Sequence, residues 1–498
     1  MRRKINILWT KANPMPDGSA PPPASATSLY ESQKTIHPRA VSGRFRTLKW
    51  TAVAVLLGIF FVLPWIRWDR GADAPGQAVL FDLAQGRFFI FAIEIWPQEI
   101  YYLTGVLIIA AVGLFLATAL AGRIWCGFGC PHTVWTDLFV RVEAFFEGDR
   151  AERIRMEKAP WTAKKIARKT GKHAVWQLIS VVSAFGMCAF FTDAPALAMD
   201  TLTMNLGSNG LTFMGLFAAS TYVMAGWTRE QMCMYMCPWP RIQTAMLDEH
   251  SLVVTYQDWR GDMRGPKRKS ESWEQRAERG FGDCIDCTQC VQVCPMGIDV
   301  RTGAQADCIN CGLCVDACDR IMDQMGRPRG LIQFASMAQT SALAAKASYR
   351  LPVIRTRTIL YTAVMGVVAT AMLFVFGNRS HLDVTVLRDR APLFVTLKDG
   401  SIRNAYTFKI TNKTRDIRQY GLVLTGIPGT ALSVAGEKEE PAQALTLEAA
   451  PDSVATYRVY VTVPAGTLTA ASTPLVFQLS DTGSREKGTY TSVFLGPN

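Results

Sequence analysis

Long apolar blocks dominate the first three quarters of the chain. Blocks of about 20 apolar residues match the thickness of a bilayer core, and several of those here end in Trp or Tyr, as membrane-interface segments do. A shorter block at 88–96 is interrupted by Glu94, and we expect it to lie at the outer membrane surface before the second span. The pattern predicts a helical polytopic membrane domain with about five spans, at residues 48–65, 102–121, 174–191, 211–227 and 358–377.

Beyond the last apolar block the pattern changes to short alternating runs. From about residue 384, apolar and polar residues alternate over 393–397, 406–410, 420–424, 455–463 and 475–479, with turn-forming residues between the runs. This length and spacing are typical of an all-β sandwich, and we predict an immunoglobulin-like one. The region has no Cys, His or Trp after residue 384, so we expect it to dock a partner rather than to perform chemistry.

The patterns divide the chain into five parts. We predict a flexible cytoplasmic tail (1–44), a membrane domain with four spans (45–250), a ferredoxin-like domain (251–350), a fifth span (351–380) and the β-sandwich (381–498). The formal net charge is +12, and Lys and Arg gather in alternate loops, as cytoplasmic loops do. We therefore expect a bacterial inner-membrane protein with a cytoplasmic N-terminus and a periplasmic β domain. Because the charge follows span boundaries rather than one recognition element, the sequence argues against nucleic-acid binding.

Cysteine spacing gives the strongest chemical signal. Eight of the 13 cysteines form two runs, C-x2-C-x2-C-x3-C-P and C-x2-C-x2-C-x3-C, within residues 284–318. In such runs three cysteines hold one 4Fe–4S cluster and the fourth holds the other cluster. Paired zinc sites are the alternative, but they do not need the interlocked fourth cysteine. We predict one cluster on Cys284, Cys287, Cys290 and Cys318, and a second on Cys308, Cys311, Cys314 and Cys294.

Two further cysteine pairs end the second and fourth predicted spans. Both have the form CxxxCP, and residues four apart share one face of an α-helix, so the thiols of each pair could converge. Soft sulfur ligands favour Cu(I). We interpret Cys188, alone in the third span, as a packing residue and His132 as a surface residue. The candidate copper ligands are Cys126, Cys130, Cys233 and Cys237, with weaker support for Met232 and Met236.

These features together resemble the FixG/RdxA/CcoG family, whose members are accessory proteins for assembly of cbb3-type cytochrome c oxidase. The resemblance includes IHPRAVSGRFR at 36–46, TVWTD at 133–137, RGDMRGP at 260–266 and DGSIRN at 399–404, and it covers nearly the whole chain after residue 30. Two positions differ from the pattern that we expect: His132 replaces Gln, and Trp239-Pro240 replaces Tyr-Ala.

The resemblance implies a membrane cupric reductase that supplies Cu(I) for the oxidase. It implies copper at the CxxxCP cysteines, and as partners oxidase assembly components and copper chaperones or transporters; a homo-oligomer is possible. Two alternatives stay open: an electron-transfer subunit of the NapH/NosR kind, which passes quinol electrons to the periplasm, and a non-enzymatic assembly factor. No nucleotide or flavin motif identifies the electron donor.

Overall fold

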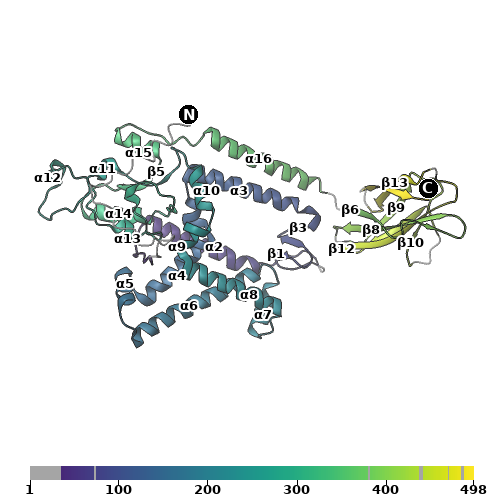
Figure 1. The fold of residues 1–498 in the computed structure, drawn as a ribbon, viewed down its shortest axis with the longest axis horizontal. Coiled ribbons are helices and arrows are strands. Elements are labelled where there is room, and N and C mark those ends of the chain that lie inside the picture. The colour runs from purple at the N-terminus through teal and green to yellow at the C-terminus, as the bar shows by residue number, and fades with distance from the viewer. Residues whose placement is uncertain are drawn as a thin grey trace, which may run out of the picture.

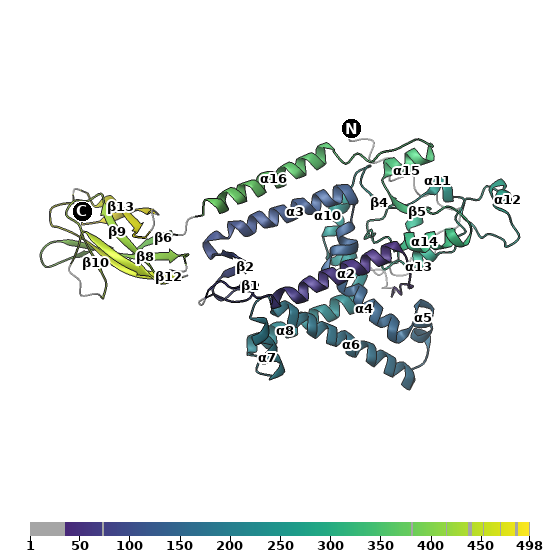
Figure 2. The same cartoon turned by 180° about the vertical axis from the view of Figure 1, so that it is seen from behind.

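The computed structural model describes residues 35–71, 74–379, 382–414, 416–436, 441–451, 453–468, 470–483 and 487–497. The cysteine-rich region and the C-terminal β domain lie at opposite ends of the molecule, and long helices run between them (Figure 1). The same order is visible from behind (Figure 2). The arrangement places the helices between the cysteine-rich region and the β domain.

Three of the described helices are long and apolar enough to span a membrane. They are α2 (Arg44–Val62, continued by a 3-10 turn to Trp65), α3 (Tyr101–Ala121) and α16 (Thr356–Gly377). None of the most apolar stretch of α16 is fully buried inside the protein. Helix α16 packs along α3 at Gly105, where an added Cβ would meet the side chain of Met372. Small residues permit this kind of close helix contact in membranes.

The third and fourth predicted spans also form helices, but with more polar ends. Helix α6 (Ala163–Cys188) begins well before residue 174, and two lysines of its basic N-terminal half, Lys169 and Lys172, pair with carboxylates of α4 (Pro131–Glu147). Lys172 is buried and its Nζ lies 2.8 Å from Glu147 of α4. Helix α8 (Ser208–Thr221) continues into a π-helical turn at Tyr222–Thr228, then α9 (Arg229–Gln231). These helices fall outside the three that match a span by length and apolarity, so five spans remain a prediction.

The apolar block at 88–96 forms strands, not a helix. Strands β1 (Val79–Asp82), β2 (Arg87–Ile90) and β3 (Ile93–Ile95) make an antiparallel sheet in that order. A 3-10 turn (Pro97–Glu99) then leads into α3. The sheet lies at the end of α2 and α3 that is nearer to the β domain (Figure 1).

The cysteine-rich region is a small α+β unit. Strands β4 (Val253–Tyr256) and β5 (Ile332–Ala335) pair antiparallel, and the two cysteine runs lie between them in the chain.

Residues 37–43, predicted as part of a tail, are packed against this region: Arg39 N donates to the Gln292 carbonyl at 2.8 Å. The other helical segments are α5 (Arg150–Lys158), α7 (Ala194–Leu202), α10 (Trp239–Met246), α11 (Asp258–Gly261), α12 (Trp273–Glu278), α13 (Gln289–Gln292), η6 (Val300–Thr302), α14 (Leu313–Gln324) and α15 (Met337–Ala344).

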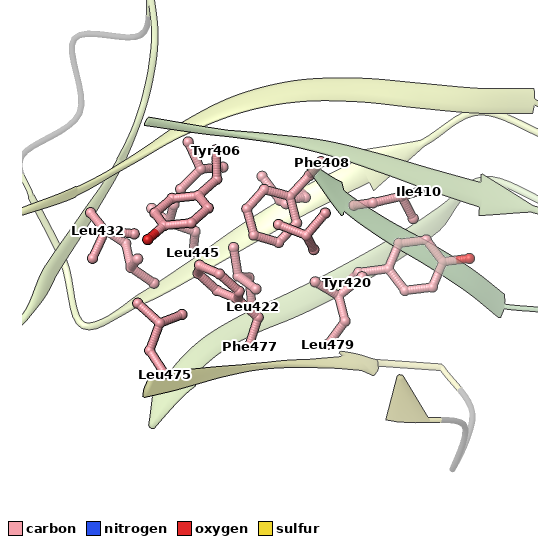
Figure 3. Packing of buried hydrophobic residues seen from close by; sticks show 14 of the residues in the cluster. Tyr406, Phe408, Ile410, Tyr420, Leu422, Leu432, Leu445, Leu475, Phe477 and Leu479 are labelled. Atoms are coloured by element: carbon pink, nitrogen blue, oxygen red, sulfur yellow. The ribbon is translucent and has the colours of Figure 1, made fainter. Parts of the chain in front are cut away.

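The C-terminal domain consists of two antiparallel sheets around one core. Phe408 and Phe477 meet edge to face across the sheets, with ring centroids 4.9 Å apart (Figure 3). Four of the five predicted runs lie in strands, but 393–397 contains only the two-residue β7. One sheet has the order β10-β12-β8-β6 with β7 beside β8, and the other β11-β9-β13-β14. The strands are β6 (Leu382–Arg388), β7 (Val395–Thr396), β8 (Ile402–Asn412), β9 (Arg418–Thr425), β10 (Ala431–Val434), β11 (Ala444–Ala449), β12 (Ser453–Val463), β13 (Ser472–Asp481) and β14 (Lys487–Leu495).

One buried carboxylate joins the β domain to the helices. Both oxygens of Glu99 accept hydrogen bonds from Arg379 at 2.8 Å, and Lys413 of the β domain donates to Oε1 at 3.0 Å. Glu99 is only 2% exposed. The side chains therefore form a buried three-residue ion cluster where the chain enters the β domain.

Candidate iron–sulfur centres and the paired CxxxCP turns

The first predicted ligand set lines one small cavity. Cys284, Cys287, Cys290 and Cys318 all contribute to its wall, and Tyr256 and Leu331 are among the residues that close it. The first three cysteines come from the first run, whose third member, Cys290, lies in α13, while Cys318 is the last cysteine of the second run and lies in α14. The fold therefore brings together the four cysteines that the sequence rule grouped.

The second predicted set lines a neighbouring cavity. Cys308, Cys311 and Cys314 contribute from the second loop, and Cys294 reaches this cavity from the first run. Its wall also includes Cys290 of the first set. The two cavities thus share a boundary, which is the arrangement that short-range electron transfer between two clusters requires.

The two cysteine loops have matching backbone conformations. In the first loop Asp286 and Thr288 have φ of 54° and 55°, and in the second Asn310 and Gly312 have φ of 53° and 73°. The positive φ values thus fall at equivalent positions, two and four residues after the first cysteine. Alternation of right- and left-handed residues turns successive N–H groups into an anion-binding concavity, as at many iron–sulfur sites. The residues present therefore fit an anionic cluster in each loop.

Burial keeps these thiols neutral until a metal displaces their protons. Burial raises the pKa of Cys290 and of Cys308 to about 11, and burial with the neighbouring Cys311 raises the pKa of Cys294 to about 12. The thiolate is the form that binds metal, so loading each site must release protons.

The two CxxxCP motifs have the same local structure, which differs from the α-helix that the sequence predicted. Each lies in a π-helical turn, at Trp125–Gly129 and Met232–Met236. The amide of Cys130 donates to the Trp125 carbonyl at 2.8 Å, and that of Cys237 donates to the Met232 carbonyl at 2.8 Å. In both, the wider turn ends at the second cysteine, and a new helix follows at or just after the proline. Such π-turns are frequent at functional sites.

The two turns meet each other. Cys126 Sγ donates to Gln243 Oε1 at 3.0 Å, and Gln243 lies in α10, directly after the second motif. Burial, then the nearby Cys130 and Cys126, raise the pKa of Cys233 to about 12. The thiols of Cys126, Cys130 and Cys233 are therefore close enough to influence one another. That the four cysteines bind copper stays a prediction.

The first turn also touches the loop of the second ligand set. A Cβ on Gly127 would lie 2.7 Å from the Ile309 carbonyl oxygen and 3.1 Å from Cys311 Cα. Cys126 and Cys311 belong to one buried cluster, and Cys233, Cys294 and Cys314 pack against or within its edge. Glycine is therefore needed at 127 for the close approach between these two parts.

Arg123 connects the second cysteine loop to α10, which follows the second CxxxCP turn. No sequence pattern pointed to this residue. Its Nη1 donates to the Cys308 carbonyl at 3.0 Å and to the Ala306 carbonyl. Its Nη2 donates to the Pro240 carbonyl, at the start of α10. The side chain is 3% exposed. It thus holds a positive charge between the second ligand set and the CxxxCP turns.

The other residues that the sequence singled out differ in burial and in what they contact. Met236 is 65% exposed and Met232 half-buried, whereas Met234 packs beside Cys233. His132 is half-buried rather than on the surface, because its Nε2 donates to the Arg229 carbonyl at 2.8 Å. Cys188 packs among Ala189, Ala194 and Leu197. Within the described part of the chain, no three His, Cys, Asp or Glu side chains are arranged to hold a single metal ion.

Comparison with known families agrees with the iron–sulfur assignment. The family described as "4Fe-4S dicluster domain" matches residues 228–337, and "4Fe-4S binding domain" matches residues 103–149, which include the first CxxxCP motif. The family described as "IG-like fold at C-terminal of FixG, putative oxidoreductase" matches residues 372–497. Together these matches support an iron–sulfur electron-transfer protein.

Three curated relatives align over almost their whole length. The nitrogen fixation protein FixG of Rhizobium meliloti is 43% identical over 94% of this chain and 93% of its own. Protein RdxB of Cereibacter sphaeroides is 43% identical over 95% of this chain and 99% of its own. Protein RdxA of the same organism is 44% identical over 93% and 97% respectively. Identity of this extent, with both cysteine motif pairs inside it, shows that the chain belongs to the FixG/RdxA family.

Proposed function

We propose that the protein is a membrane cupric reductase that delivers single electrons to Cu(II) at the CxxxCP turns. The observation that carries the proposal is the contact between these turns and the second cysteine loop at Gly127. When bound, two 4Fe–4S clusters would supply a path for single electrons. Cys284, Cys287, Cys290 and Cys318 would hold one cluster, and Cys294, Cys308, Cys311 and Cys314 the other.

The chemistry of the CxxxCP thiols supports copper as the substrate. Thiolates favour Cu(I) over Cu(II), so a site with two or more of them makes reduction of the bound ion easier. Gln243 positions the Cys126 thiol at 3.0 Å. The turns are open on one side, where Tyr235 and Met236 are 70% and 65% exposed. An ion could enter and leave there without disturbing the cavities of the two cysteine loops.

The arrangement of the helices supports a division of the protein by the membrane. Helix α3 has 21 residues, which at about 1.5 Å per residue spans a bilayer core of about 30 Å. If α2, α3 and α16 cross the membrane, the cysteine-rich region lies on one side and the β domain on the other. We propose that the cysteine region is cytoplasmic and that the periplasmic β domain docks oxidase-assembly or copper-delivery proteins.

A double variant tests the proposed function. Cys233→Ser with Cys237→Ser should abolish tight copper binding and cupric reduction, while the iron content stays at that of the parent. Cys188→Ser is the matched control, because Cys188 packs away from both motif pairs. The measurement is anaerobic Cu(I) formation with metal analysis of the purified full-length protein.

Other outcomes of that experiment would each contradict a part of the proposal. If the double variant reduces copper at the parent rate, the CxxxCP turns are not the site of copper reduction. A loss of iron in the variant would mean that the turns hold a cluster instead of copper. Clusters that never reoxidise with Cu(II) would favour a non-enzymatic assembly factor.

A further inference from the structure

A cavity lies between the membrane helices and the cysteine-rich region. Its volume is about 420 Å³, within the range of small-molecule sites. Its walls come from the first two turns of α2, from α4, from residues 36–43 and from residues around the two cysteine runs. Helix α2 is long and apolar enough to span a membrane. The cavity therefore lies at one end of a candidate membrane span.

The lining of this cavity carries an excess of positive charge. Two carboxylates belong to it, those of Asp137 and Glu230. Its six basic residues are Arg39, Arg46, Lys49, Arg141, Arg153 and Arg229. Six cations against two carboxylates make the cavity a site for an anion rather than for a neutral molecule.

The ion pairs of the wall do not remove this excess, because the carboxylates are shared. Arg46 Nη1 and Lys49 Nζ lie 2.8 and 3.6 Å from the same oxygen of Asp137. Glu143, which is outside the lining, is shared by three cations. A buried cation that is incompletely neutralised is costly, so an anion in the cavity would supply charge that the wall lacks. The three cations that share Glu143 are Arg153, Lys172 and Arg229.

Arg141 is the lining cation most accessible to a ligand. Its side chain is exposed, and it forms no ion pair with any carboxylate that the structure describes. Thr47, in the first turn of α2, is also exposed and lines the cavity. Residues that are both exposed and part of the lining mark the open side of a cavity. The opening therefore lies between the start of α2 and the middle of α4, with an unpaired guanidinium at its edge.

Large apolar side chains flank this opening. Leu48, next to Thr47, is 50% exposed, and Phe145 of α4 is 82% exposed. Phe145 follows Arg141 by four residues, so the two side chains lie on one face of α4. Exposed apolar side chains beside basic ones are typical of the membrane interface, where the cation reaches the headgroups and the apolar group the acyl chains. A phospholipid matches both features, whereas a nucleotide or a free phosphate ion has no acyl chain.

We propose that this cavity binds the headgroup of an anionic phospholipid from the surrounding membrane. Basic pockets between membrane helices bind such headgroups at the cytoplasmic face of other proteins. The phosphate would be attracted by Arg141 and the basic wall, and the acyl chains would leave past Leu48 and Phe145. The inference requires that α2 enters the membrane, but it does not depend on the proposed copper reaction.

The test titrates dioleoylphosphatidylglycerol into the delipidated full-length protein in detergent, with bound lipid counted by native mass spectrometry. The parent should bind this lipid saturably, and should bind the zwitterionic dioleoylphosphatidylcholine about tenfold more weakly. Arg141→Gln should raise Kd for the anionic lipid about five-fold, the effect of one basic side chain near an anionic headgroup. Arg155→Gln is the matched control, because it removes the same charge from an exposed position on α5 outside the lining, and its Kd should stay near that of the parent.

A second pair of variants separates charge from size. Ala144 lines the cavity on α4. Ala144→Glu and Ala144→Gln introduce side chains of nearly equal size, but only the first adds a negative charge. Ala144→Glu should raise Kd for phosphatidylglycerol about five-fold more than Ala144→Gln does. Binding of phosphatidylcholine should differ less between the two variants.

The other outcomes overturn the inference. Equal affinity of the parent for the two lipids would show that negative charge is not selected. A Kd for phosphatidylglycerol that is the same in Arg141→Gln as in Arg155→Gln, and the same in Ala144→Glu as in Ala144→Gln, would place the lipid elsewhere on the protein. Displacement of the lipid by inorganic phosphate would identify a free-phosphate site, and displacement by NADH a nucleotide site. Copper reduction by the parent bears on none of these results, so the proposed function and the lipid site can fail separately.

Discussion

The protein contains two duplicated cysteine motifs, and the two duplications are built differently. Each CxxC loop has two left-handed residues, such as Asn310 and Gly312, and each cavity takes its fourth cysteine from the other run. Each CxxxCP motif is a π-helical turn, and the second turn contains the exposed Met236. The two loops enclose the predicted cluster sites, whereas the second turn is partly exposed.

The largest expected effect tests whether only the loops hold iron. The parent should contain about eight iron atoms per chain. Cys294→Ser should remove most of the iron of the second cluster, because Cys294 lines that cavity and not the first. Cys126→Ser should leave the iron unchanged. The checks are iron and sulfide analysis with EPR of the reduced protein, and a parent near twelve irons would place a third cluster at the turns.

A glycine substitution tests the contact between the two kinds of motif. Gly127→Ala places a Cβ 2.7 Å from the Ile309 carbonyl oxygen, and overpacking of this sort costs about 1–3 kcal/mol. Separation of the turn from the loop should slow copper-dependent reoxidation of the clusters about tenfold, with iron content retained. Gly215→Ala in α8 is the control, because nothing lies within 4 Å of its Cβ position. Equal rates in the two variants would mean that the contact is not the electron path.

A charge substitution tests how the loops and turns influence each other. Arg123→Gln removes a buried positive charge beside Cys308. Because reduction adds negative charge to a cluster, the midpoint potential of the second cluster should fall, while that of the first should change less. Arg123→Lys keeps the charge and should restore much of the potential. Redox titration followed by EPR measures both, and an unchanged potential in Arg123→Gln would refute this electrostatic role.

The smallest expected effect concerns the end of the molecule that has no cysteine. Hydrogen bonds to Lys413, Trp96 and Arg379 outweigh burial and hold the pKa of Glu99 below its usual value. The contact therefore stabilises the junction at pH values above the unfolded pKa, and its contribution is lost as pH falls through the lowered folded value. Glu99→Ala should remove the carboxylate that pairs with Arg379 and Lys413 and make the chain next to Arg379 easier to cleave by protease.

The control for the junction is Glu448→Ala, on the exposed face of β11. Limited proteolysis of both variants between pH 4 and 8 gives the comparison. Cleavage of Glu99→Ala at the parent rate throughout would show that the ion cluster does not hold the β domain.

Local patterns explain which parts of this structure the sequence could predict. The ligand grouping of Cys318 and Cys294 follows from spacing alone, because each loop is short and its geometry is nearly fixed by its cluster. The strands at 406–410 and 455–463 follow from alternation in the same way. Strands β6, β10, β11 and β14 lie outside the five predicted runs. They are short or at the edges of the sheets, and pairing with β8, β12, β9 and β13 respectively holds them in place.

Other features depend on contacts between distant residues. The π-turn at Trp125–Gly129 was predicted as α-helix because four-residue spacing fits both. Gln243 meets Cys126 across 117 positions of the chain, and Arg123 meets Cys308 across 185. Polar residues commonly follow a membrane span, so nothing in the sequence indicated that Gln243 or Arg123 contacts a cysteine motif.

The position of the CxxxCP turns along α3 has a consequence for energetics. The turns follow the same end of α3 as the cysteine-rich region, and the β domain lies beyond the other end (Figure 1). If α3 spans the membrane, the electron of the proposed reaction stays on one side of the bilayer. Moving a charge across a bilayer is worth about 2.3 kcal/mol per 100 mV, so the proposed copper reduction should not depend on the membrane potential. Transfer of the Cu(I) product to the other side would then need a separate transporter.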